Sequence, residues 1–178
     1  MAILLKKPLI KRKVFFSFNF EVDFWRTQQI RHIGTIEGNS LITANKWEEI
    51  KKKGDVAIKK WIDENLENKS CLIVLIGEDT ADRKWIDYEI EKAWNSNKGV
   101  FGIRIHNLEN QKGKQSKAGK NPFIGFELCQ GKVKLSSIVK IKNPPQLTGK
   151  GVYSHINTNL KTWIEKAIKI RKEFVCPK

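Results

Sequence analysis

An aromatic side chain and a carboxylate stand four residues apart in the segment GEDTADRKWIDYEIEKAW, which spans residues 77–94. The two are Trp85 and Glu89, and the segment is typical of a helix that follows a strand and a polar turn. Residues i and i+4 share a helix face, so the indole and the carboxylate are expected to be neighbours. A carboxylate there can stabilise positive charge on a sugar ring. In an arbitrary helix, the commoner arrangement is a solvated acid, here paired with Lys92, beside a core tryptophan.

Other chemistries lack their sequence motifs. There is no GxGxxG, GxxxxGKS or GxxxxGKT, GxSxG or HExxH, which excludes the common dinucleotide, P-loop, serine-hydrolase and zinc-protease sites. A phosphoacceptor receiver domain needs paired carboxylates after its first strand, where this chain has Ser17, Phe18 and Asn19. No metal site is expected. The three cysteines, at 71, 129 and 176, are far apart, which favours reduced thiols over disulfides.

Strands and helices alternate along the chain. We expect strands at 14–18, 71–76, 100–105 and 133–141, with a further short one and a loop within 33–45. Helices are expected at 21–32, at 46–66 with a break at Gly54, at 81–97 and at 153–174. This order predicts a doubly wound α/β fold, with a mainly parallel sheet and helices on both faces.

Apolar spacing indicates which side of each helix is buried. In the three longest helices the residues expected to face the core are Val56, Ala57, Trp61 and Ile62, then Ile86, Ile90, Ala93 and Trp94, then Ile156, Leu160, Trp163, Ile164, Ala167, Ile168 and Phe174.

The chain of 178 residues is expected to form one domain, residues 1–178. Residues 1–12 are interpreted as a basic extension, 107–122 as a flexible loop and 153–174 as the last helix. No apolar run is long enough to span a membrane, so we expect a cytoplasmic protein. The formal charge is +15, but scattered lysines make most of it, so nucleic acid is not an expected partner and a phosphate-bearing ligand is only weakly favoured.

In doubly wound sheets, ligands bind beyond the carboxyl ends of the strands, where the winding reverses. Helix amides after Thr80 can receive a phosphate there, and Arg83 is either an assisting cation or a solvated charge. Arg26 and Arg31 are expected with equal weight either to face the cleft or to lie in solvent. His106 follows a strand at the same edge, but a single histidine is more often structural.

Two stretches resemble the TIR (Toll/interleukin-1 receptor) domain family. Residues 15–18 (FFSF) are similar to the family's Phe-Ile-Ser-Tyr first strand, and 85–90 (WIDYEI) to its Trp-Cys-x-x-Glu-Leu helix. Longer phrases, such as IGEDTADRKWIDYEI and GIRIHN, resemble the TIR-like proteins of the bacterial Thoeris anti-phage system. The resemblance covers residues 13–107 and is weak beyond them. It implies a flavodoxin-like, TIR-like domain.

The resemblance also implies an activity, the cleavage of NAD+ at the nicotinamide–ribose bond. NAD+ would be the substrate, no cofactor is implied, and the product would be a cyclic ADP-ribose-type signal that activates a partner effector. Glu89 matches the catalytic glutamate and Trp85 the aromatic residue beside it. The other substrate-binding residues expected are Ser17, Phe18, Asn19, Thr80 and Arg83. Self-assembly by TIR–TIR contact is a further implied property.

This sequence departs from the family pattern at two places. Ile86 stands where the family has cysteine, and the Arg-Asp-x-x-Pro-Gly loop after the second strand is replaced by GTIEGNS. The second change bears on assembly, because that loop often mediates TIR–TIR contacts. Two other functions stay open at this point, a non-enzymatic TIR adaptor and a nucleoside N-glycosidic transferase.

Overall fold

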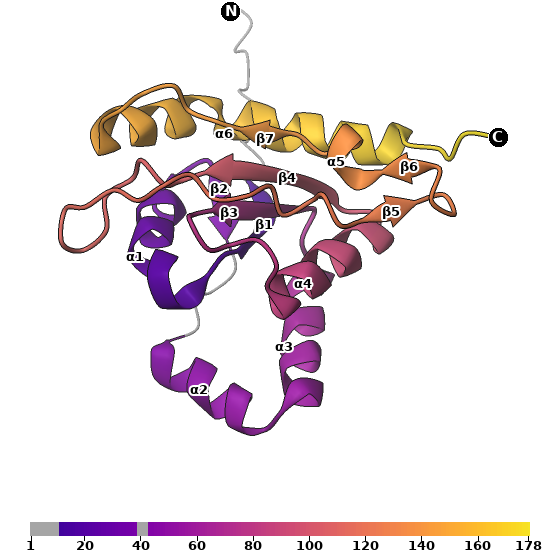
Figure 1. Ribbon diagram of the computed structural model, residues 1–178, viewed down its shortest axis with the longest axis horizontal. Coiled ribbons are helices and arrows are strands. Elements are labelled where there is room, and N and C mark those ends of the chain that lie inside the picture. Colours follow the sequence, from indigo (N-terminus) through magenta and orange to yellow (C-terminus); the bar gives the residue numbers. More distant parts are fainter. Residues whose placement is uncertain (1–10, 39–42) are drawn as a thin grey trace, which may run out of the picture.

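The computed structural model describes residues 11–38 and 43–178, and its centre is a five-stranded parallel sheet (Figure 1). The strand order is β2-β1-β3-β4-β7, and all four pairings are parallel. The strands are β1 Arg12–Ser17, β2 Ile36–Gly38, β3 Cys71–Ile76, β4 Gly99–Arg104 and β7 Ile141–Lys142. A separate antiparallel pair is formed by β5 Glu127–Leu128 and β6 Val133–Lys134.

Helices cover both faces of the sheet, as the alternating pattern predicted. They are α1 Phe20–Arg31, α2 Ala44–Lys52, α3 Asp55–Glu67, α4 Lys84–Asn95, α5 Leu135–Ile138 and α6 Gly149–Glu173. One core cluster joins the sheet to α1 and α6, and the other joins it to α2, α3, α4 and α5. The flavodoxin-like, TIR-like fold class is therefore confirmed, and the winding reverses between β1 and β3.

β3 explains why the centre of the sheet is apolar throughout. All six of its residues are buried, and alternate side chains enter the two clusters: Cys71, Ile73 and Leu75 one, Leu72, Val74 and Ile76 the other. A parallel strand covered on both faces needs no polar side, which is why CLIVLI is unbroken.

The predicted helix boundaries hold within a few residues, and Gly54 separates α2 from α3 as expected. The predicted buried side of α3 is confirmed for Ile62, and Ala57 and Trp61 pack against the same core cluster, but Val56 does not face the core. Ile58, Ile62 and Leu66 are buried, whereas Val56 is 82% exposed. The break at Gly54 places Val56 in the first turn of a new helix, where it faces solvent.

Two predictions near the C-terminus are wrong in part. The segment 133–141 is not one strand, because a helical turn, α5, interrupts it. Leu135, the first residue of this turn, and Val139, which directly follows it, are buried. The Ser137 hydroxyl donates to the Lys134 carbonyl at 2.7 Å, a local bond that competes with strand pairing. Phe174 lies beyond α6 and packs against Trp94 in the opposite cluster.

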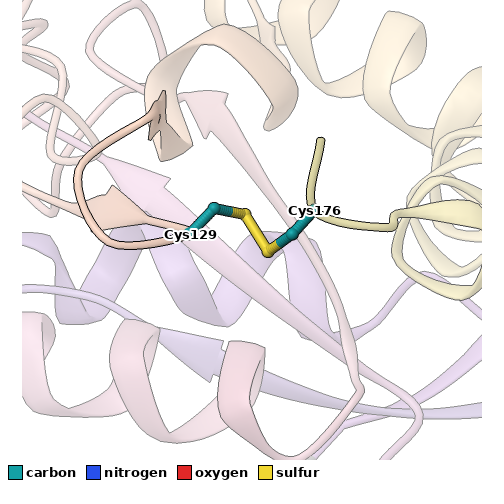
Figure 2. Close-up of a disulfide and its surroundings, with 2 residues drawn as sticks. All are labelled: Cys129 and Cys176. Carbon is teal, nitrogen blue, oxygen red and sulfur yellow. A yellow bond between two sulfur atoms is a disulfide. The ribbon is translucent and has the colours of Figure 1, made fainter. Parts of the chain in front are cut away.

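The expectation of reduced cysteines is also wrong, because Cys129 and Cys176 form a disulfide (Figure 2). Cys129 follows β5, and Cys176 follows the end of α6. The long α6 runs back along the sheet and brings the two cysteines together although 47 positions separate them. Spacing along the chain gave no sign of this pairing. Cys71 is a free thiol buried in β3.

Residues 107–122 contain no helix or strand, as expected, but they are held against the body of the protein. Leu108 is fully buried, and the Arg26 guanidinium donates to the carbonyls of Leu108, at 2.8 Å, and Lys114, at 3.1 Å. The expected basic extension falls mostly on residues 1–10, outside the described residues. Within the described ranges no helix is both long and apolar enough to cross a membrane.

Candidate active site

A cavity of about 260 Å³ lies beyond the carboxyl end of β1, beside the N-terminal end of α4. Its walls come from β1 and the residues that follow it, from α1, from α2 and α3, and from the start of α4. The lining residues are Phe15, Phe16, Phe18, Asn19, Phe20, Glu21, Trp47, Lys51, Trp61, Arg83, Lys84, Trp85, Ile86 and Glu89. We call this space the aromatic cavity. It lies where the winding reverses, the position predicted for a ligand site.

The turn from β1 into α1 places three of the predicted residues. Ser17 ends the strand and is buried. Asn19 is the N-cap of α1, and its side chain accepts a hydrogen bond from the backbone N–H of Glu21 at 3.2 Å, the usual reason for asparagine at this position. Phe18 and Asn19 line the aromatic cavity, and Ser17 lies behind them next to Glu89.

Trp85 and Glu89 both line the aromatic cavity, which confirms that their spacing places them on one face of α4. Ile86, in the position where the family has cysteine, also lines it. The Trp85 ring is held edge-on against Tyr88, with centroids 6.3 Å apart, and the Lys84 ammonium lies 4.7 Å from the indole centroid. These two contacts help to fix the orientation of the indole in the cavity wall.

The Glu89 carboxyl is buried, with only 8% of the residue exposed. Loss of solvation raises its pKa to about 8, and the neighbouring Ser17 hydroxyl partly opposes this shift. That hydroxyl makes no hydrogen bond of ordinary geometry in the structure, so it is available to the carboxylate. A buried acid with a raised pKa in a lined cavity is typical of a functional site.

Sequence reasoning missed the wall that α2 and α3 contribute. Trp47 and Trp61 meet edge to face with centroids 5.9 Å apart, and Trp61 also contacts Phe15 at 6.2 Å. Phe20 completes this wall next to Trp47, at 6.5 Å. The sequence places Trp61 on the core face of its helix and does not single out Trp47; only the concentration of tryptophan in 46–66 could have drawn attention to the pair.

Positive groups border the same cavity. Arg83 and Lys84 line it from the start of α4, and Lys51 from α2. Arg83 is the N-cap of α4, and its side chain makes no capping hydrogen bond; instead its Nε donates to the Asp79 carbonyl at 2.7 Å. The first amides of α4 are therefore not capped by that side chain, which suits an anion at this helix end.

Thr80, which was predicted to bind substrate, does not line the aromatic cavity. Its hydroxyl accepts from the Gly77 N–H at 2.9 Å and donates to the Leu75 carbonyl at 3.3 Å, so it is used within the turn. The helix begins at Lys84 and not directly after Thr80. Thr80 thus shapes the segment that carries Arg83.

The other candidates from the sequence lie elsewhere. Arg26 is buried and pairs with Asp23 at 3.0 Å, and neither residue lines the aromatic cavity. Desolvation raises the pKa of Asp23, although Arg26 opposes this shift. His106 has its pKa lowered by burial and by the nearby cations Arg104 and Arg26. Arg31 also lies outside the cavity lining.

This arrangement combines a carboxyl sheltered from water, aromatic rings that can stack on planar groups, and cations at the edge. It suits a ligand with a flat, positively charged ring at one end and phosphate at the other. Ionised Glu89 can stabilise a cation that forms on a sugar within the cavity.

Comparisons with known proteins indicate a family for this chain. Residues 15–110 match the family model described as "Thoeris protein ThsB, TIR-like domain". A protein of Bacillus cereus (strain MSX-D12), named "Putative cyclic ADP-D-ribose synthase ThsB1", is 35% identical over 124 residues. The aligned region is 65% of this chain and 64% of that protein, so this chain spans just under two thirds of its relative's length.

Proposed function

The chain belongs to the Thoeris ThsB TIR-like domain family, and on that premise we propose that it cleaves NAD+ and forms a cyclic ADP-ribose-type product. One observation carries the proposal: the Glu89 carboxyl is buried in the aromatic cavity, next to Trp85. The relative's name, a cyclic ADP-D-ribose synthase, supports the same reaction.

The chemistry needs only one carboxylate. The bond between nicotinamide and the ribose breaks with both electrons going to the ring nitrogen, so the pyridinium leaves as neutral nicotinamide without a proton donor. Positive charge develops on the ribose, as in glycoside hydrolysis. Ionised Glu89 stabilises that charge, and a carboxylate in a site of low polarity does so more strongly than one in water.

The bound substrate itself supports the ionised form of Glu89. Burial favours the neutral carboxyl near pH 7, because it raises the pKa of Glu89 to about 8. A pyridinium cation in the cavity acts in the opposite direction, since an opposite charge nearby lowers the pKa of an acid. Substrate binding and ionisation of Glu89 are therefore coupled.

The fate of the ribosyl cation sets the product. Water gives ADP-ribose, whereas a nucleophile within the same dinucleotide closes a ring. The apolar walls of the aromatic cavity exclude water, which favours ring closure. We include in the proposal a cytoplasmic location, a role in anti-phage defence, and an effector activated by the released nucleotide.

Self-assembly belongs to the same proposal. Val22 and Trp25 on α1 are 47% and 48% exposed, so α1 presents apolar side chains to solvent while it buries Asp23 and Arg26. Two large apolar side chains exposed together on one helix are unusual for a surface that meets only water, and they support contact with a second TIR domain.

The test is nicotinamide release from NAD+ by the purified chain, alone and in extracts of phage-infected cells that supply an activating signal. Glu89→Gln keeps the shape of the side chain and removes its charge, so we expect release to fall about 100- to 1,000-fold. The matched control is Glu91→Gln, an exposed glutamate of the same helix, which should keep wild-type release.

Full release by Glu89→Gln would remove Glu89 from the mechanism. Folded wild-type protein that releases no nicotinamide under either condition would favour the adaptor function. Release of a base from nucleosides but not from NAD+ would indicate the N-glycosidic transferase instead.

A further inference from the structure

Two helices each present an indole and a charged group to the aromatic cavity, four residues apart. On α4 these are Trp85 and Glu89, and on α2 they are Trp47 and Lys51. In both cases the i, i+4 spacing places the pair on one helix face. One group is acidic and the other basic, so the cavity has a carboxyl on one helix and an ammonium on another, and a cationic ligand beside the carboxyl favours its ionised form.

The two charges lie at different depths. The Glu89 carboxyl is almost completely buried, with 8% of the residue exposed. The Lys51 side chain is 34% exposed, and the Lys84 side chain is 63% exposed. The Glu89 carboxyl therefore lies deep in the cavity, and the positive groups lie toward solvent.

This order of charges matches a ligand that enters with its cationic end first and keeps its anionic part at the mouth. We propose that Lys51 binds the pyrophosphate of the dinucleotide and so fixes the orientation in which the nicotinamide end reaches Glu89. The inference rests on the proposed function for the identity of the substrate, and it adds a specificity residue on α2, a helix to which the family motifs assign no role.

Lys51 is the cation that can change partners with the least disturbance. Its Nζ lies 2.6 Å from Glu48 on the same helix, and the Glu48 side chain is 57% exposed. A solvent-exposed pair of this kind contributes about 1 kcal/mol or less. A phosphate carries more charge and more acceptor oxygens, so it can displace Glu48 without moving another element.

The two cations on the α4 side, Arg83 and Lys84, already contact other parts of the protein. Lys84 pairs with Asp55 and so joins α4 to α3, while the Nε of Arg83 holds the carbonyl of Asp79 in the preceding turn. Both can add positive potential at the mouth, and the first amides of α4 lie beside them. Lys51 lies on a different helix, so it determines on which side of the cavity the phosphates are held.

The experiment compares two fragments of the substrate by calorimetric titration of the full chain. ADP-ribose carries the pyrophosphate without nicotinamide, and nicotinamide riboside carries the cationic ring without phosphate. Lys51→Gln should weaken ADP-ribose binding about tenfold, the usual scale for loss of one charged hydrogen bond, and leave the affinity for nicotinamide riboside unchanged.

Two variants of the same helix complete the design. Lys52→Gln makes the same change of charge at an exposed residue outside the cavity lining, and we expect no more than a twofold effect on either fragment. Glu48→Gln frees Lys51 from its partner, so ADP-ribose should bind with equal or higher affinity.

Each outcome decides the matter. Unchanged ADP-ribose affinity in Lys51→Gln, equal losses for both fragments, or equal losses in Lys51→Gln and Lys52→Gln would overturn the role of Lys51. Those results are independent of turnover: wild-type protein that releases nicotinamide while Lys51→Gln binds ADP-ribose normally would refute this inference alone. If the wild type neither binds a fragment nor releases nicotinamide, the proposed function fails, and the role of Lys51 with it.

Discussion

Glu89 is an acid that is both buried and raised in pKa, a combination that is typical of functional sites. It is buried, and its carboxyl lies beside the Ser17 hydroxyl, which opposes the raised pKa without forming a hydrogen bond of ordinary geometry. Burial of an acid costs stability whenever the pH ionises it in the unfolded chain. In a site that stabilises a cation this loss of stability has a functional benefit, because a buried carboxylate attracts the cation more strongly than a carboxylate in water does.

This cost can be measured as a dependence of stability on pH. The pKa of Glu89 is about 8 in the folded protein against a model value of 4.5, so between these values only the folded form binds the proton. Its contribution to stability is complete below about pH 4.5 and declines as the pH rises toward 8. The loss is about 1.4 kcal/mol for each pH unit within that interval.

Glu89→Gln should remove this decline, because glutamine does not titrate. We expect urea unfolding to give similar stabilities for the two proteins at pH 5 and a more stable variant at pH 8, by several kcal/mol on the scale just given. The contributions of all other titratable groups cancel when the stability of the wild type is subtracted from that of the variant at each pH. If the difference between wild type and Glu89→Gln is flat from pH 5 to 8, the carboxyl is not shielded from water as described.

At the scale of elements, the loops beyond the strands pack closely against one another at glycines, where a side chain would prevent the contact. A Cβ on Gly77 would overlap the Asp23 carboxylate of α1, and a Cβ on Gly119 would overlap the Gly77 carbonyl oxygen. Three segments that are distant in the sequence, α1, the turn before α4 and the 107–122 loop, are thereby stacked. The turn that carries Arg83 depends on this stack for its position.

Gly119→Ala is expected to destabilise the protein by about 1–3 kcal/mol, because the overlapping atoms belong to backbone that cannot rotate away. Gly125→Ala is the matched control: it is exposed, and a Cβ there meets nothing within 4 Å. Thermal unfolding of both variants tests this difference, and the release of nicotinamide should fall with Gly119→Ala. Equal melting temperatures for the two variants would show that the stack is not tight.

The elements differ in how far the sequence alone could predict them. β3 and the i, i+4 pair on α4 were predictable, because an unbroken apolar run and a helical spacing are local signals. The aromatic wall of Trp47 and Trp61 was not, since it depends on how α2 and α3 fold back onto β1. The prediction of one strand over 133–141 was wrong for a related reason: tertiary burial of Leu135 and Val139 prevailed over a local preference for strand. The hydrogen bonds of the Thr80 hydroxyl within its turn were not predictable either, because they depend on the path of the backbone.

At the scale of the whole molecule, a disulfide joins the C-terminal residues to the β5–β6 hairpin, away from the candidate active site. In Figure 1 the β5–β6 hairpin and the C-terminus lie at the right, whereas α1, which follows the carboxyl end of β1, lies at the left. The disulfide ties the residues after α6 to this hairpin (Figure 2). Phe174 and Arg171 pack on Trp94 in the same region, at 5.3 Å and 4.7 Å, so the chain end is held by packing as well.

Reduction of the disulfide should therefore lower stability without removing the site. Closing a loop of 47 residues restricts the unfolded chain by an amount worth about 4 kcal/mol in the chain-entropy description. We expect the double variant Cys129→Ser, Cys176→Ser to unfold at lower urea concentration and to keep the nicotinamide release of the wild type. A reductant should reproduce the loss in the wild type and change nothing in the double variant. If the reductant also shifts the double variant, or leaves the wild type unchanged, the link does not stabilise the fold. If release disappears while the protein stays folded, the hairpin and the aromatic cavity are coupled across the sheet.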